Sequence, residues 1–156
     1  MTQPKKIDYK IHRECSRQWR SLLSAMAQEQ AESPQDSEPQ ALMHRIGVRF
    51  ASQSSLPACS DMDALQQAIC ARWQTMDWGW IELEEEGGKL RIVHHCATNG
   101  DLLAGAFGEA TEAWVPAFLG GVYQQWLSTL GAGNQLRVRQ VTGIDEFGTT
   151  ELELSI

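Results

Sequence analysis

The chain has 156 residues, enough for one domain with a substantial hydrophobic core. Its hydrophobic fraction of 42% and charged fraction of 21% are ordinary for a soluble globular protein, and no apolar run approaches the ~20 residues of a membrane span. The formal net charge of −7 argues against a general binder of nucleic acid or of anionic membranes. We therefore expect one domain, residues 1–156, with no nucleic-acid partner and no membrane span.

The charge is unevenly distributed along the chain. Residues 1–20 contain six basic and two acidic residues, which leaves seven basic and eighteen acidic residues in the remainder. A basic arm on an acidic body can dock onto a neighbouring copy of the same body. We read residues 1–10 as a basic N-terminal arm and regard self-assembly as a reasonable expectation.

Cysteine usage and the N-terminal sequence indicate a compartment. The cysteines lie at positions 15, 59, 70 and 96, with no CxxC spacing. The first residues are polar and never reach the apolar segment of a secretory signal. Scattered cysteines in this setting are typical of reduced thiols. We expect a cytoplasmic protein, with the periplasm as the alternative.

Apolar residues at helical spacing predict three helices in the first half of the chain. The first lies near residues 11–31. The second begins at residues 37–40, which resemble a capping box with Pro39 in the first turn, and it continues to Gln53. The third begins near Asp61, with acids at the positive end of its dipole, and its apolar stripe reaches Met76.

A fourth helix is predicted over residues 112–130, and it contains Gly120 and Gly121 in its middle. Each such glycine costs roughly 1 kcal/mol relative to alanine. The expected compensation is a close approach of another backbone, from the same chain or from another subunit.

Alternating residues predict two hairpins. Gly87-Gly88 joins a run from residue 80 to a run ending near residue 94, because both central residues of a type I′ turn need positive φ. This turn sets Leu83 opposite Ile92 and Glu84 opposite Arg91. Residues 135–141 and 150–156 form the second pair. The predicted class is α+β: a four-stranded antiparallel sheet of two hairpins with about four helices on one face and a charged opposite face.

Trp78 and Trp80 share the parity of the charged face, which is unusual for large aromatic side chains. Three interpretations are open. The strand is covered there by a helix or loop, so both rings belong to the core. The outer face is a subunit interface that both rings anchor. Both rings form a stacking platform for a sugar or another flat ligand.

Catalytic and metal-binding patterns are not evident in the sequence. The chain has no G-x-S-x-G, P-loop or dinucleotide fingerprint. His94 and His95 are neighbours on a strand, so their side chains point to opposite faces and cannot share one ion. The run Glu82 to Glu86 could suggest glycoside hydrolysis, but alternate carboxylates face cations across the hairpin. We expect no catalytic residues, no metal and no cofactor.

Three segments carry a family resemblance: residues 77–81 (DWGWI), residues 90–94 (LRIVH) and residues 114–126 (WVPAFLGGVYQQW). Together they resemble the family of bacterial cellulose synthase D subunits (cellulose synthase operon protein D), and the order, spacing and length fit the whole chain. The resemblance implies a non-catalytic accessory protein of cellulose biosynthesis. It also implies dimers that build a ring-like octamer, with the N-terminal segments inside passages for nascent glucan chains.

The resemblance implies partners and candidate residues. Expected partners are other copies of this chain, other subunits of the cellulose synthase complex and nascent β-glucan. Glucan is flat, and its axial C–H groups pack on aromatic rings. The candidate residues for the glucan passage lie on or near the arm: Lys5, Lys6, Tyr9, Lys10 and Trp19. The candidate residues for the oligomer interface are Trp78, Trp80, Gly120 and Gly121.

Two other functions remain open at this level. One is a dimeric regulatory domain that binds a small ligand, with a pocket between the helix at residues 114–130 and the sheet. The other is an enzyme acting on β-glucan through Glu82 or Glu84.

Overall fold

The computed structural model describes residues 39–76, 78–97, 111–133 and 135–155. The predicted α+β class and the four-stranded antiparallel sheet are confirmed. The helix predicted near residues 11–31 and the basic arm lie outside the described residues. No helix in the described ranges has the length and apolar character to cross a bilayer.

In chain order the elements are α3 (Pro39–Gln53), α4 (Met62–Gln74), β1 (Trp80–Glu86), β2 (Lys89–His95), α6 (Thr111–Leu127) with its π-helical continuation η2 (Ser128–Ala132), β3 (Arg137–Gln140) and β4 (Thr150–Ser155).

The sheet has the order β1-β2-β4-β3, so the two hairpins join through β2 and β4. The predicted register of the first hairpin is confirmed, with Leu83 opposite Ile92 and Glu84 opposite Arg91. Gly87 and Gly88 take φ values of 60° and 79°, as a type I′ turn requires. In the second hairpin Arg139 lies opposite Glu153.

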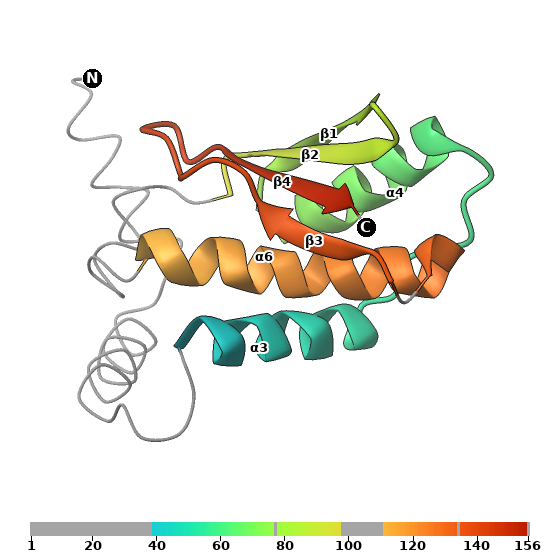
Figure 1. The fold of residues 1–156 in the computed structure, drawn as a ribbon. Coiled ribbons are helices and arrows are strands. Elements are labelled where there is room, and N and C mark those ends of the chain that lie inside the picture. Colours follow the sequence, from blue (N-terminus) through green and yellow to red (C-terminus); the bar gives the residue numbers. More distant parts are fainter. Residues whose placement is uncertain (1–38, 77, 98–110, 134, 156) are drawn as a thin grey trace.

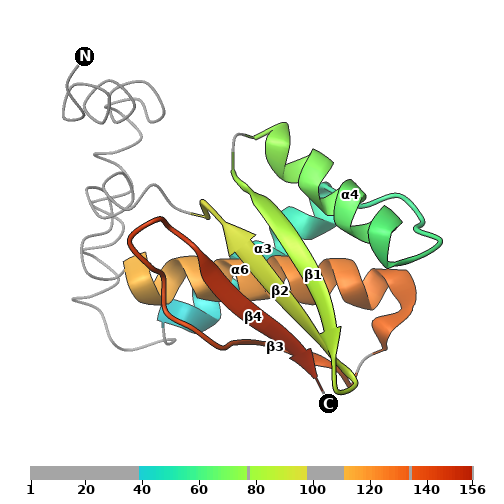
Figure 2. The same ribbon diagram turned by 90° about the horizontal axis from the view of Figure 1, so that it is seen from above.

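The helices lie on one side of the sheet. In Figure 1, α6 runs beneath the strands and α3 lies on the far side of α6. Figure 2 shows α4 alongside β1 at the edge of the sheet. The interface between α6 and the sheet is closed, because Leu119, Val122 and Leu152 are each 0% exposed. The opposite face of the sheet carries the charged side chains.

A close crossing of two helices explains the glycines in α6. A Cβ added to Gly121 would lie 2.0 Å from the carbonyl oxygen of His44, and one added to Gly47 would lie 2.0 Å from that of Phe118. Each glycine therefore admits the backbone of the other helix, and the predicted close approach is made by α3 of the same chain. Gly120 is different, because an added Cβ would meet only side-chain atoms, at 3.9 and 4.0 Å.

Side chains from the helices bind both edges of the sheet. Along β1, the amide of Ile81 donates to Cys70 Sγ at 3.4 Å, and the amide of Leu83 donates to Gln66 Oε1 at 2.7 Å. Along β3, Gln124 of α6 accepts from the amide of Val138 and donates to the carbonyl of Leu136, both at 2.9 Å. Edge groups that another strand could pair with are thus partly occupied.

We expect Gly121→Ala and Gly120→Ala to change stability in opposite directions. The added methyl at Gly121 would push α3 and α6 apart, which we expect to lower the free energy of unfolding by about 1–3 kcal/mol. The methyl at Gly120 meets no clash and gains helix propensity, so the free energy of unfolding should rise by up to about 1 kcal/mol. Urea denaturation measures both. Equal effects of the two variants would contradict the helix crossing.

Candidate functional site

The outer face of the sheet carries a ladder of ion pairs. Arg91 lies at its centre, with Nη2 and Nε 2.7 and 3.2 Å from the carboxylate of Glu151 and Nη1 2.9 Å from Glu84. Lys89 Nζ lies 3.0 Å from Glu153. The hydrogen bond and charge of Glu151 raise the pKa of Arg91, and the hydrogen bond from Lys89 lowers the pKa of Glu153. These groups are held in their charged forms on an open surface.

The pairs on this face include carboxylates from the run Glu82 to Glu86 in the first hairpin. Glu84 is committed to Arg91, as predicted from the register. Glu82 lies 3.6 Å from His95 Nε2, which is an ion-pair distance but too long for a hydrogen bond. General acid catalysis by a carboxyl group usually needs a site shielded from water, and the side chains of Glu82 and Glu84 are 57% and 53% exposed. The geometry suits recognition of charge.

Trp80 lies at one end of this outer face. It pairs with His95 in the register, and the two rings stack with centroids 5.2 Å apart and planes 21° apart. The residue is 45% exposed, although the indole is one of the largest apolar side chains. An exposed tryptophan held in one orientation by a neighbouring ring is a suitable anchor for a partner surface.

Trp78 does not share this face, so the parity inferred for it from the sequence was wrong. Gly79 takes φ of 73°, where a Cβ would lie 1.9 Å from the carbonyl oxygen of His95. This conformation breaks the alternation of the strand just before β1. Trp78 instead turns inward, stacks on Phe118 at 5.3 Å and donates from Nε1 to the carbonyl of Ala97 at 2.6 Å.

The structure places the four residues predicted for the oligomer interface in different environments. Contacts within one chain account for Trp78 and Gly121. Gly120 is buried near His44 and Leu152 of its own chain. Trp80 is the member of this group that remains exposed, and its interface role stays a prediction. The passage residues Lys5, Lys6, Tyr9, Lys10 and Trp19 lie outside the described part of the chain.

A chain of hydrogen bonds crosses the core behind the outer face. Trp73 Nε1 donates to Tyr123 Oη at 3.1 Å, Tyr123 Oη lies 2.6 Å from His94 Nδ1, and His94 Nε2 lies 2.8 Å from the carbonyl oxygen of Trp78. A carbonyl can only accept, so Nε2 carries the proton and Nδ1 accepts from the tyrosine. Each polar hydrogen of these three side chains then has an acceptor.

Burial sets the protonation states of these groups. Loss of solvation lowers the pKa of His94 to about 4, and it raises the pKa of Tyr123 well above its usual value. Both groups are therefore neutral at pH 7. His94 is a hydrogen-bonded strand residue, and His95 lies on the opposite face beside Trp80, as predicted from their adjacent positions on the strand. Within the described ranges no three His, Cys, Asp or Glu residues gather in a way that could hold a metal ion.

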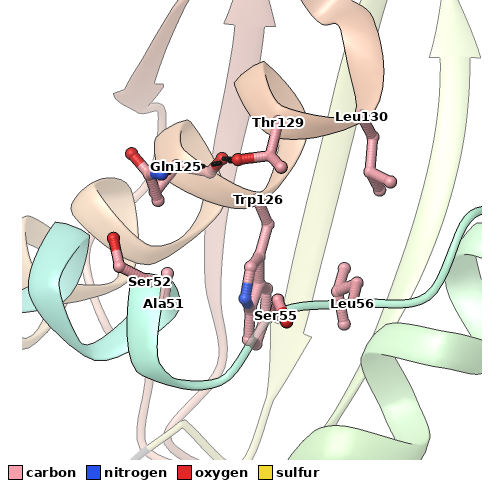
Figure 3. Close-up of a pocket in the computed structure, with 8 residues that line it drawn as sticks. All are labelled: Ala51, Ser52, Ser55, Leu56, Gln125, Trp126, Thr129 and Leu130. Atoms are coloured by element: carbon pink, nitrogen blue, oxygen red, sulfur yellow. Dashed lines mark hydrogen bonds between the residues drawn. The ribbon is translucent and has the colours of Figure 1, made fainter.

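A pocket of about 160 Å³ lies where α3 and α6 end. Figure 3 shows its walls, which come from the end of α3, the segment after it, and α6 with η2. Trp126 fixes one wall by donating from Nε1 to the carbonyl of Ser54 at 2.8 Å. The pocket lies on the α3 side of α6. The pocket expected between this helix and the sheet would fall where Leu119, Val122 and Leu152 are fully buried. Sequence reasoning missed this pocket, because its walls come from segments about 70 residues apart.

Stability should fall as the pH decreases because of His94. The unfolded chain binds a proton near pH 6.5, whereas folded His94 binds one only near pH 4. The stabilisation is therefore complete above pH 6.5 and is lost as the pH falls towards 4. We expect the free energy of unfolding to drop by about 2 kcal/mol between pH 7.5 and pH 5.0.

Urea denaturation of the wild type and of His94→Gln across this range measures the effect. Burial also lowers the pKa of His44, but His44 is present in both proteins and cancels in the difference. Parallel pH profiles for the two proteins would refute the assignment to His94.

Comparison with known proteins identifies the family. Residues 5–154 match the family described as the D subunit of cellulose synthase. A cellulose synthase operon protein D of Komagataeibacter xylinus is 31% identical over 108 residues, covering 67% of each chain. A second K. xylinus protein of that name is 28% identical over 90 residues, and the match spans about half of its length, 55%. This chain therefore belongs to the cellulose synthase D-subunit family.

Proposed function

We propose that this protein is a non-catalytic accessory subunit of a bacterial cellulose synthase complex that works as a self-assembled scaffold. The observation that carries the proposal is the family match over residues 5–154. The relatives are named for the cellulose synthase operon, and neither their name nor that of the family denotes a catalytic subunit. The scaffold would arrange nascent β-1,4-glucan chains and promote their crystallisation.

The described surfaces support a scaffold role. The outer face carries fixed charges of both signs, which give a contact both specificity and register. Trp80 lies at the end of this ladder as an exposed aromatic ring. The strand edges are partly occupied by Gln66, Cys70 and Gln124, so assembly through the face of the sheet is favoured over strand addition. Closed rings are a common product of such assembly, and we propose dimers that build an octamer.

A complementation experiment tests the role in cellulose synthesis. A cellulose-producing bacterium that lacks its own gene of this family would express this chain, and cellulose yield and crystallinity would be measured. Recovery of both relative to an empty vector is the expected result. Expression of soluble, folded protein with no recovery of either quantity would overturn the proposal.

Trp80→Ala and Trp78→Ala form a matched pair for the interface. We expect Trp80→Ala to lower the order of the oligomer in light scattering with little loss of fold stability, because the residue is already 45% exposed. Trp78→Ala should lower the free energy of unfolding by about 3–5 kcal/mol, because it removes a ring packed on Phe118. If Trp80→Ala lowers the stability of the fold as strongly as Trp78→Ala, Trp80 is a core residue; a stable variant with unchanged oligomer order would refute its interface role.

A further inference from the structure

Phe147 is exposed on an ordered loop. It is 72% exposed, the highest value among the exposed large hydrophobic residues of the described ranges. The loop is nevertheless well fixed. Asp145 Oδ1 accepts from the amides of Phe147 and Thr149 at 2.9 and 2.8 Å, and the carbonyl of Gly148 accepts from the amide of Ala97 at 2.8 Å. A loop whose backbone is already fixed loses little backbone entropy when a partner binds it.

The pocket at the ends of α3 and α6 has the right size for this ring. Its volume is about 160 Å³, and cavities of roughly 150 Å³ with apolar walls take up benzene. Leu56, Leu130 and Trp126 supply apolar walls, and Ser52 and Thr129 lie at its sides (Figure 3). A phenylalanine side chain presents the same ring as benzene, so the pocket matches the loop in size and in polarity.

The loop is acidic, and the surroundings of the pocket are basic. Asp145 and Glu146 precede Phe147 directly. None of the residues that line the pocket is charged, and Arg72 Nη2 donates to the carbonyl oxygen of Ser55 at its rim, at 2.8 Å. Arg49 lies one turn before Ser52 on α3, close enough to be its surface neighbour. An acidic loop that enters this pocket would therefore approach two guanidinium groups.

The loop and the pocket cannot meet within one chain. Residues 141–149, which connect β3 to β4, lie at the end of the molecule where α6 begins, whereas α3 and α6 end at the other (Figures 1 and 2). A contact between them joins the head of one copy to the tail of the next. Such heterologous contacts generate rings when the rotation closes.

We propose that Phe147 of one copy inserts into the pocket beside Trp126 of a neighbouring copy and forms a head-to-tail contact of the assembly. The contact rests on the proposed function, because it needs self-assembly. It adds a second interface that is distinct from the face of Trp80. The ring supplies the buried apolar area, and Glu146 near Arg72 or Arg49 sets the orientation.

Sedimentation velocity over a range of concentrations tests the loop side. Phe147→Ala should weaken association about 30-fold, as expected for an aromatic anchor at the centre of a contact. Val141→Ala is the matched control, because Val141 is 56% exposed in the same connection. Glu146→Lys should also weaken association, and less so at high salt. An unchanged profile for Phe147→Ala, or an equal loss for Val141→Ala, would overturn the contact.

A second pair of variants tests the pocket side of the contact. Ser52→Trp fills the pocket from an exposed position and should weaken association as Phe147→Ala does, whereas Gln53→Trp, on the next residue outside the pocket, should not. Mixing Phe147→Ala with Ser52→Trp gives the sharpest test. The first variant keeps the pocket and the second keeps the ring, so each mixed pair recovers one intact contact and a heterodimer should form. A mixture that associates no better than either variant alone would refute a head-to-tail contact.

These experiments distinguish a failure of the Phe147 contact from a failure of the proposed function. If these variants keep the wild-type oligomer and Trp80→Ala dissociates it, this contact is wrong and the scaffold role stands. If the wild-type chain assembles through Phe147 but fails to restore cellulose in the deletion strain, the contact stands and the proposed role fails.

Discussion

The packing around Trp73 is the interaction on which the rest of the fold depends. Its indole is fully buried and stacks on Phe50 of α3, with further ring contacts to Trp78, His94, Tyr123 and Trp126. One side chain from α4 thus touches α3, α6, β2 and the segment before β1. Its N–H begins the hydrogen-bonded chain through Tyr123 to His94. Aromatic area supplies the stability, and the directed hydrogen bonds select one arrangement of the rings.

This core also explains what is left at the surface. The indoles of Trp73, Trp78 and Trp126 each have a hydrogen-bond acceptor inside the chain. Trp80 and Phe147 remain exposed; the ring of Trp80 stacks on His95, and the backbone amide of Phe147 donates to Asp145. The exposed part of a large apolar ring adds little to the stability of a single chain. One lies on the face of the sheet and the other on a connecting loop, and both are available to a partner.

Local patterns gave most of the fold, because hairpin and helix signals are short-range. The Gly87-Gly88 turn predicted the register of the first hairpin, and Asp61 predicted the start of α4. The pairing of β2 with β4 is between strands about 60 residues apart, and no local pattern specifies it. Trp78 was misplaced because alternation was extended through Gly79, whose positive φ ends it. The partners of His94 and the pocket beside Trp126 depend on the same long-range packing, so sequence alone could not provide them.

The glutamines at the two edges of the sheet have a consequence for aggregation. Strands with free edges stack into cross-β fibrils, and the risk grows with local concentration. Here the amide of Gln66 caps β1 and that of Gln124 caps β3, each from a helix packed beside its strand. Another strand could pair with these particular groups only if α4 or α6 moved away from its strand. The same helices that bury Trp73 and Trp126 thus also protect the edges of the sheet from pairing with other chains.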